Sequence, residues 1–272
     1  MSKFAETYPK FFEKASAEES AFGFDVAKLA GLAPALRFLY EAWWKVDLTG
    51  LNLLPPDGPA LIVGNSGSVL PWPAMMLLFA LMSNRDNPRR LSILADMDWI
   101  NDERMHRSLL EIGFVPWSAD HAKRLFAQGQ IVAAFPEGLA GLSKPFSERY
   151  RLRPLDWTKF LPAVEERVPI FPLATVGCDE AVPVIANLEG VARFLNLPSF
   201  PLTPFFPWLP FPACFASLPV KWTMHVMKSC PSASGKNRHE LEDAAKHQAE
   251  FLEGEIQAEL NRMLRTRIKS PF

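Results

Sequence analysis

The sequence predicts an α/β fold with a mainly parallel sheet that helices cover on both faces. Short apolar runs of strand length, such as residues 60–63 and 131–135, alternate with amphipathic stretches of helical length. These runs are apolar at successive positions, which is typical of strands buried on both faces of a parallel sheet. Ligands of such folds bind at the carboxyl ends of the strands. The turns that directly follow strands are therefore the first places to look for a site.

The individual elements follow from where apolar periodicity starts and stops. Strands are expected at residues 46–48, 60–63, 90–94, 114–116, 131–135, 169–176 and 221–227. Helices are expected at residues 3–22, 24–45, 73–83, 103–111, 119–128, 157–166 and 240–267. In the last helix, apolar residues recur every three or four positions from Leu241 to Met263. We expect two domains: an N-terminal helical segment at residues 1–45 and an α/β domain at residues 46–272.

Composition excludes some classes of function. The formal net charge of −1 gives no support for nucleic-acid binding. The three cysteines are far apart, so they predict neither a zinc site nor a disulfide framework, and a reducing, cytoplasmic compartment is expected. The first twenty residues lack the apolar core of a signal peptide. The apolar run at residues 69–82 contains Pro71 and Pro73 and is shorter than the roughly 20 residues that a membrane-spanning helix needs.

A proline-rich segment lies late in the chain. Residues 197–219 contain seven prolines, together with Phe205, Phe206 and Trp208, so they predict an irregular loop. Two interpretations remain open. The loop either packs on the core or presents apolar surface to a membrane or an acyl chain.

Two turns after predicted strands carry polar residues. Residues 64–68 read GNSGS and contain no acidic, basic or thiol side chain. The second turn, at residues 136–141, contains Glu137 between Pro136 and Gly138, and Lys144 and Arg149 follow it. A carboxylate with nearby cations suits a phosphate-bearing ligand whose hydroxyl must be held. The alternative is an ordinary turn with a solvated glutamate.

Four short motifs in order resemble those of glycerolipid acyltransferases. FPEG at residues 135–138 resembles the third motif of that family, and residues 46–59 resemble the lead-in to the first. GFVP at residues 113–116 resembles the second motif, and residues 168–173 resemble the fourth. The resemblance covers roughly residues 40–268 and implies an acyltransferase of lipid metabolism, with the family's fold. Residues 141–152 and the block TPFFPWLP resemble a bacterial subgroup.

The resemblance implies a specific reaction. A fatty acyl group passes from acyl-CoA or acyl carrier protein, as co-substrate, to a hydroxyl of a lysophospholipid or related lipid. No bound cofactor and no metal are implied. In the family, Glu137 and Gly138 would hold the acceptor, and we add Asn65, Lys144 and Arg149 to the expected substrate-binding residues.

The first motif departs from the family pattern of Asn-His-x-x-x-x-Asp. Asn65 matches the asparagine, but Ser66 occupies the histidine position, and Pro71 or Pro73 occupies that of the aspartate. In the family the histidine is the general base for the acceptor hydroxyl. Loss of such a base typically lowers the rate by about 10²–10⁴-fold.

Three readings remain. The first is an acyltransferase with impaired turnover or with a base supplied by His106, His121 or His225. The second is a catalytically inactive pseudoenzyme that binds lipid, acyl chains or an active partner. The third is a serine esterase-like hydrolase that uses Ser66 as nucleophile, since Asp179 and His225 follow it in triad order.

Membrane association is a further expectation. A lipid acyltransferase must reach acceptors in a bilayer, so we expect a peripheral protein at the inner, cytoplasmic face of the membrane. Trp72, Phe205, Phe206 and Trp208 are the expected contacts with the acyl chain or the membrane. An acyl carrier protein or a second copy of the chain is a further candidate partner.

Overall fold

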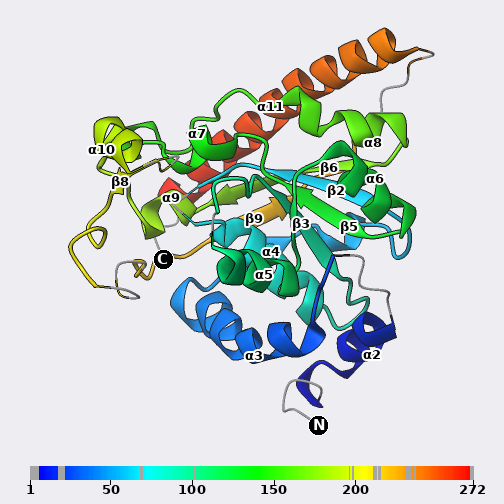
Figure 1. Cartoon of the computed structure of the whole chain (residues 1–272), viewed down its shortest axis with the longest axis horizontal. Helices are drawn as coiled ribbons and strands as arrows, with labels where there is room; N and C mark the ends of the chain where they lie inside the picture. The colour runs from blue at the N-terminus through cyan, green and yellow to red at the C-terminus, as the bar shows by residue number, and fades with distance from the viewer. Residues whose placement is uncertain are drawn as a thin grey trace.

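The fold is a seven-stranded sheet with helices on both faces (Figure 1). The computed structural model describes residues 6–17, 22–67, 70–100, 102–195, 197, 199–210, 213, 216–230, 235 and 237–269. The α/β fold predicted from the apolar patterning, with its mainly parallel sheet, is confirmed. Predictions that fall on the remaining positions, among them residues 3–5 and 18–21 of the first expected helix, lie outside the described residues.

The sheet has the strand order β1-β9-β6-β2-β5-β3-β4. Its strands are β1 (Asp47–Thr49), β2 (Ala60–Gly64), β3 (Leu91–Ala95), β4 (Phe114–Pro116), β5 (Ile131–Ala134), β6 (Ile170–Val176) and β9 (Thr223–Val226). Strands β6, β2, β5, β3 and β4 are mutually parallel, whereas β9 pairs antiparallel with β6 and carries β1 parallel to itself. All seven expected strands are present, within about two residues of their predicted ends.

Alternate side chains of the strands point into two hydrophobic cores, one on each face of the sheet. In β2, Ile62 points to one core, while Leu61 and Val63 point to the other. The first core is closed by α2 (Pro9–Ala17), α3 (Val26–Arg37), α4 (Trp72–Ser83) and α5 (Glu103–Glu111). The second is closed by α6 (Ala119–Ala127), α8 (Leu161–Glu165) and α11 (Arg238–Lys269). The N-terminal helices thus share a core with the sheet.

Several short elements were not predicted. They are α7 (Gly138–Leu142), α9 (Cys178–Ala181), α10 (Glu189–Phe194) and a hairpin of β7 (Ala186–Asn187) and β8 (Pro201–Leu202). Each is too short to show a period in the sequence. The second expected helix ends in a π-helical turn, Phe38–Trp43, and the expected helix at 157–166 divides into a 3₁₀ turn, Trp157–Lys159, and α8. The proline-rich segment is irregular over most of its described residues, as predicted.

Arg89 holds together the amino-terminal edge of the sheet. Its guanidinium donates hydrogen bonds to the carbonyl oxygens of Pro55, Pro56, Gly58 and Gly129 at 2.8–3.0 Å. These carbonyls lie in the loops that lead into β2 and β5, and Arg89 itself precedes β3. The residue is buried, so the four bonds replace water that the guanidinium loses on folding.

We expect Arg89→Met to lower the free energy of unfolding by about 3 kcal/mol or more, since several hydrogen bonds to a buried charge are lost together. Urea unfolding would measure the change. Arg85→Met removes an exposed arginine of the same approach to β3 and should change stability by less than about 0.5 kcal/mol. Equal effects of the two substitutions would contradict this assignment.

Candidate active site

Two turns meet at the carboxyl end of the sheet. Strand β2 runs into the turn of Asn65 and Ser66, and its neighbour β5 runs into the turn of Glu137. The backbone N–H of Ser66 donates to Glu137 Oε1 at 2.6 Å, and both residues are buried. The sequence placed both turns at this edge, but it did not show that they are bonded to each other.

Glu137 is fully engaged. Its Oε2 accepts the backbone N–H of Arg153 at 2.8 Å and Lys144 Nζ at 3.1 Å. Lys144 also donates to the carbonyl oxygen of Arg151 at 2.9 Å. The side chains of Glu137 and Lys144 are 0% and 2% exposed. Burial raises the pKa of Glu137 above its ordinary range, against the opposing effects of Lys144 and the two backbone donors.

This arrangement differs from the expected binding site. Glu137 and Lys144 were expected to contact a substrate, yet here they bind each other and the backbone. A ligand would reach them only if this ion pair opened. Arg149 lies elsewhere: its guanidinium sits 4.4 Å over the ring of Phe146, and it lines an open groove with Arg267.

Asn65 fixes the first turn to the neighbouring strand. Its side chain donates to the carbonyl oxygen of Thr175 at 3.1 Å and accepts the backbone N–H of the same residue at 2.7 Å. Because Thr175 belongs to β6, these two bonds tie the turn after β2 to the neighbouring strand. The amide of Asn65 therefore positions Ser66.

Two glycines let other segments approach the turn closely. A Cβ on Gly141 would lie 2.6 Å from Glu137 Cβ and 2.7 Å from Ser66 Cβ. A Cβ on Gly67 would lie 2.2 Å from the sulfur of Cys178. The sulfur of Cys178 therefore packs against the turn, and burial raises the pKa of its thiol well above the ordinary value.

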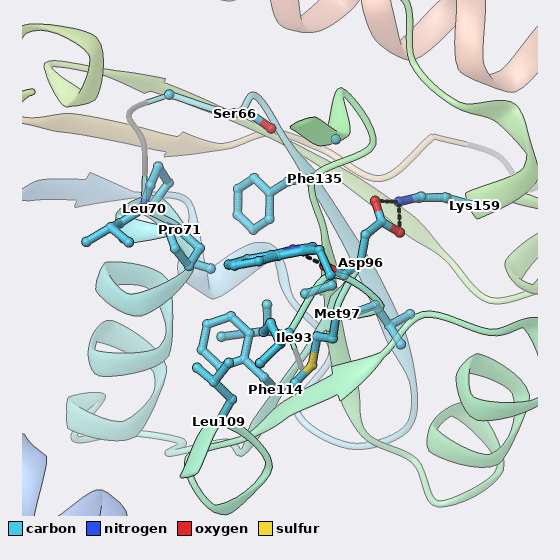
Figure 2. A pocket seen from close by; sticks show the side chains of 18 of the residues that line it. Ser66, Leu70, Pro71, Ile93, Asp96, Met97, Leu109, Phe114, Phe135 and Lys159 are labelled. Carbon is cyan, nitrogen blue, oxygen red and sulfur yellow. Dashed lines mark hydrogen bonds and ion pairs between the residues drawn. The ribbon is translucent and has the colours of Figure 1, made fainter. Parts of the chain in front are cut away.

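An apolar cavity begins at the first turn (Figure 2). It has a volume of about 190 Å³ and runs between α4, β3, β4 and α5. Its apolar wall consists of Leu70, Pro71, Pro73, Ala74, Ile93, Leu94, Ala95, Met97, Trp99, Ile100, Met105, Leu109, Phe114 and Phe135. Gly138, which was expected at the site, also lines it, as does Ser66.

An ion pair that the sequence analysis missed lies at the polar end of this cavity. Lys159 Nζ donates to Asp96 Oδ1 at 2.8 Å and to Oδ2 at 2.6 Å, and both residues line the cavity (Figure 2). Asp96 directly follows β3. The rule that sites gather at the carboxyl ends of strands could have found Asp96, but Lys159 comes from a 3₁₀ turn 63 residues away.

None of the three candidate histidines is among the residues that line the cavity. His121 Nδ1 is 2.8 Å from the carbonyl oxygen of Pro116, and His106 lies on α5 beside a separate groove. His225 Nδ1 is 2.6 Å from Glu259 Oε1 on α11. Asp179 instead accepts the backbone N–H of Tyr150 at 3.0 Å. The expected order of Ser66, Asp179 and His225 therefore does not form a triad here.

The aromatic residues expected to contact acyl chains or a membrane lie outside the cavity lining. Trp72 packs edge-on against Trp44, with ring centroids 5.2 Å apart. Phe205 and Phe206 are half-buried, whereas Trp208 is 68% exposed. Within the described parts of the chain, no helix has the length and apolar character needed to cross a membrane, and no cluster of His, Cys, Asp or Glu could hold a metal ion.

We expect Gly141→Ala to destabilise the protein by about 1–3 kcal/mol, because the added methyl group would press the two turns apart. Gly254→Ala on α11, where a Cβ would meet nothing within 4 Å, should instead stabilise it by up to about 1 kcal/mol. Urea unfolding of both variants gives the comparison. A gain in stability for Gly141→Ala would show that the turns are not closely packed.

Comparisons with known proteins found one matching family model and several similar sequences. The family model described as Acyltransferase matches residues 45–176. Uncharacterized proteins of Mycobacterium tuberculosis (strain H37Rv) and Mycobacterium leprae (strain TN) are 37% and 36% identical, and each match covers 74% of this chain. The chain spans only 56% and 55% of the length of these relatives.

A solved structure shows the same fold. The 1-acyl-sn-glycerophosphate acyltransferase of Thermotoga maritima matches with a TM-score of 0.50 at 14% identity, over 94% of this chain and 92% of that one. The matched residues 45–176 include both turns and most of the cavity. Residues 45–176 thus match a family model described as Acyltransferase, and the chain shares the fold of this solved structure.

Proposed function

We propose that this protein transfers a fatty acyl group from acyl-CoA or acyl carrier protein to a hydroxyl of a lysophospholipid or related lipid. The observation that carries the proposal is the apolar cavity that begins at Ser66. Among the described residues that line it, only Ser66, Asp96 and Lys159 carry charged or hydroxyl groups. A cavity with one polar end and a long apolar wall suits an acyl chain whose carbonyl stays at the polar end.

The missing His and Asp lower the proposed rate. An alcohol is a weak nucleophile, and removal of its general base typically costs about 10²–10⁴-fold. A bound thioester and hydroxyl still react faster than the same groups free in water, because the site holds them together. We therefore propose slow transfer.

One observation favours a second candidate, acyl-chain binding without turnover. No imidazole is among the described residues that line the cavity, whereas its apolar wall is long enough to contact an acyl chain at many residues. With this function, the protein would bind an acyl chain or assist an active partner.

Binding and turnover can be measured on the same samples. We expect the wild type to bind cis-parinaric acid and to release thiol slowly from palmitoyl-CoA when 1-acyl-glycerol-3-phosphate is present. Ala74→Phe should weaken both at least about tenfold, since Ala74 lines the cavity and a ring would fill it. Ala127→Phe, on the exposed side of α6, is the matched control. Probe binding without any acceptor-dependent thiol release would support the binding protein and reject the enzyme.

We propose in addition that the segment between β6 and β9 contacts a membrane surface. Phe194 on α10 is 85% exposed, and Trp208 is the second strongly exposed aromatic residue of the segment. Ile185, Leu195 and Leu209 add further exposed apolar surface. Aromatic and aliphatic side chains at this density suit the boundary between headgroups and acyl chains.

We expect Phe194→Ser combined with Trp208→Ser to abolish most co-sedimentation with phosphatidylglycerol-containing vesicles. Phe251→Ser removes an aromatic residue from α11 that is 52% exposed, so it controls for a general loss of surface hydrophobicity. Co-sedimentation that survives the double substitution would exclude this segment as the contact.

A further inference from the structure

We propose that Asp96 is a catalytic residue that takes the proton from the acceptor hydroxyl, in place of the histidine that the family motif has at the position of Ser66. This inference rests on the proposed acyl transfer. It assigns the chemistry to a carboxylate that directly follows β3, and β3 is the second strand away from β2 in the sheet order.

Few side chains near the cavity can accept a proton from a substrate hydroxyl. Glu137 is buried and accepts three hydrogen bonds, so it offers no free surface to a hydroxyl. The three histidines considered above lie outside the cavity lining. Among the described residues that line the cavity, Asp96 is the one carboxylate, and its side chain is 39% exposed. It is accessible both from solvent and from the cavity.

Asp96 is better placed to contact the hydroxyl of the acceptor than to contact the acyl chain of the donor. Strand β3 pairs with β5, so the end of β3 lies beside the turn that contains Gly138. A Cβ built on Gly138 would lie 3.6 Å from Asp96 Oδ2. Figure 2 shows the carboxylate to one side of Phe135, with the apolar wall formed by Ile93, Phe114 and Leu109 below. An acyl chain would follow the wall, and a hydroxyl arriving from solvent would meet Asp96.

Lys159 holds the carboxylate in place. Its ammonium bonds both oxygens of Asp96 and lies 5.6 Å from the ring centre of Trp117. An ionised carboxylate has about four lone-pair sites, so acceptor capacity remains after these two bonds form. Lys159 is therefore a positioning residue that orients the Asp96 carboxylate, and Asp96 can accept a further hydrogen bond from a substrate hydroxyl.

The proposed step conserves atoms and electrons. Asp96 accepts the hydroxyl proton while the hydroxyl oxygen forms a bond to the thioester carbonyl carbon. The resulting tetrahedral species collapses, the carbon–sulfur bond breaks, and the electron pair leaves with sulfur. The thiolate then takes the proton from Asp96, so the products are an ester and a free thiol, and the carboxylate is regenerated.

The test compares Asp96→Asn with Asp98→Asn. Both substitutions remove one negative charge from the same loop, but Asp98 is exposed and is not among the cavity-lining residues. We expect Asp96→Asn to lower kcat for acceptor-dependent thiol release by about 100-fold or more, with binding of cis-parinaric acid unchanged. Asp98→Asn should stay within about twofold of wild type in both measurements.

The outcomes separate two failures. An active wild type together with an equally active Asp96→Asn variant would overturn the role of Asp96 and leave the proposed acyl transfer standing. A wild type without acceptor-dependent thiol release would overturn the acyl transfer itself, and the role of Asp96 with it. Loss of cis-parinaric acid binding in Asp96→Asn would assign Asp96 to donor binding and reject its role as a base.

Discussion

The candidate active site depends on the hydrogen bonds that the buried carboxylate of Glu137 accepts. This carboxylate joins the turn after β2, the turn after β5 and the segment that carries Lys144 and Arg153. A buried charge is tolerated only when it is paired and hydrogen-bonded, and removing one partner leaves an uncompensated charge. The turn of Ser66 therefore keeps its shape for as long as Glu137 keeps its three donors, whether or not Ser66 has a chemical role.

Two carboxylates at the carboxyl edge of the sheet, Glu137 and Asp96, have different surroundings and different roles. Glu137 is sealed inside and organises the backbone, whereas Asp96 is partly exposed and faces the cavity. Two carboxylates thus have opposite surroundings within a few residues of the ends of the neighbouring strands β3 and β5. Burial and the number of hydrogen-bond donors therefore decide which of the two carboxylates is open to contact with a substrate.

Much of the fold could be predicted from the sequence, because it depends on local patterns. The seven strands and the long helix α11 show their apolar periods directly, and both polar turns were placed correctly at strand ends. The roles of individual residues depended on contacts between distant segments. The bond from Ser66 to Glu137 spans 71 residues and that from Lys159 to Asp96 spans 63. No pattern in the sequence reports such contacts, so the three bonds that enclose Glu137 were not predicted and Asp96 went unnoticed.

The position of Arg89 in the fold bears on how the sequences of such proteins can change. Arg89 fixes the loops at the amino-terminal edge of the sheet, far from the turns at the carboxyl edge. Arg89 and the side chains of the candidate active site therefore lie at opposite ends of the same strands. A lineage can replace a catalytic side chain at one end without disturbing the residue that secures the other. The fold can then outlast a particular reaction and remain available for a modified one.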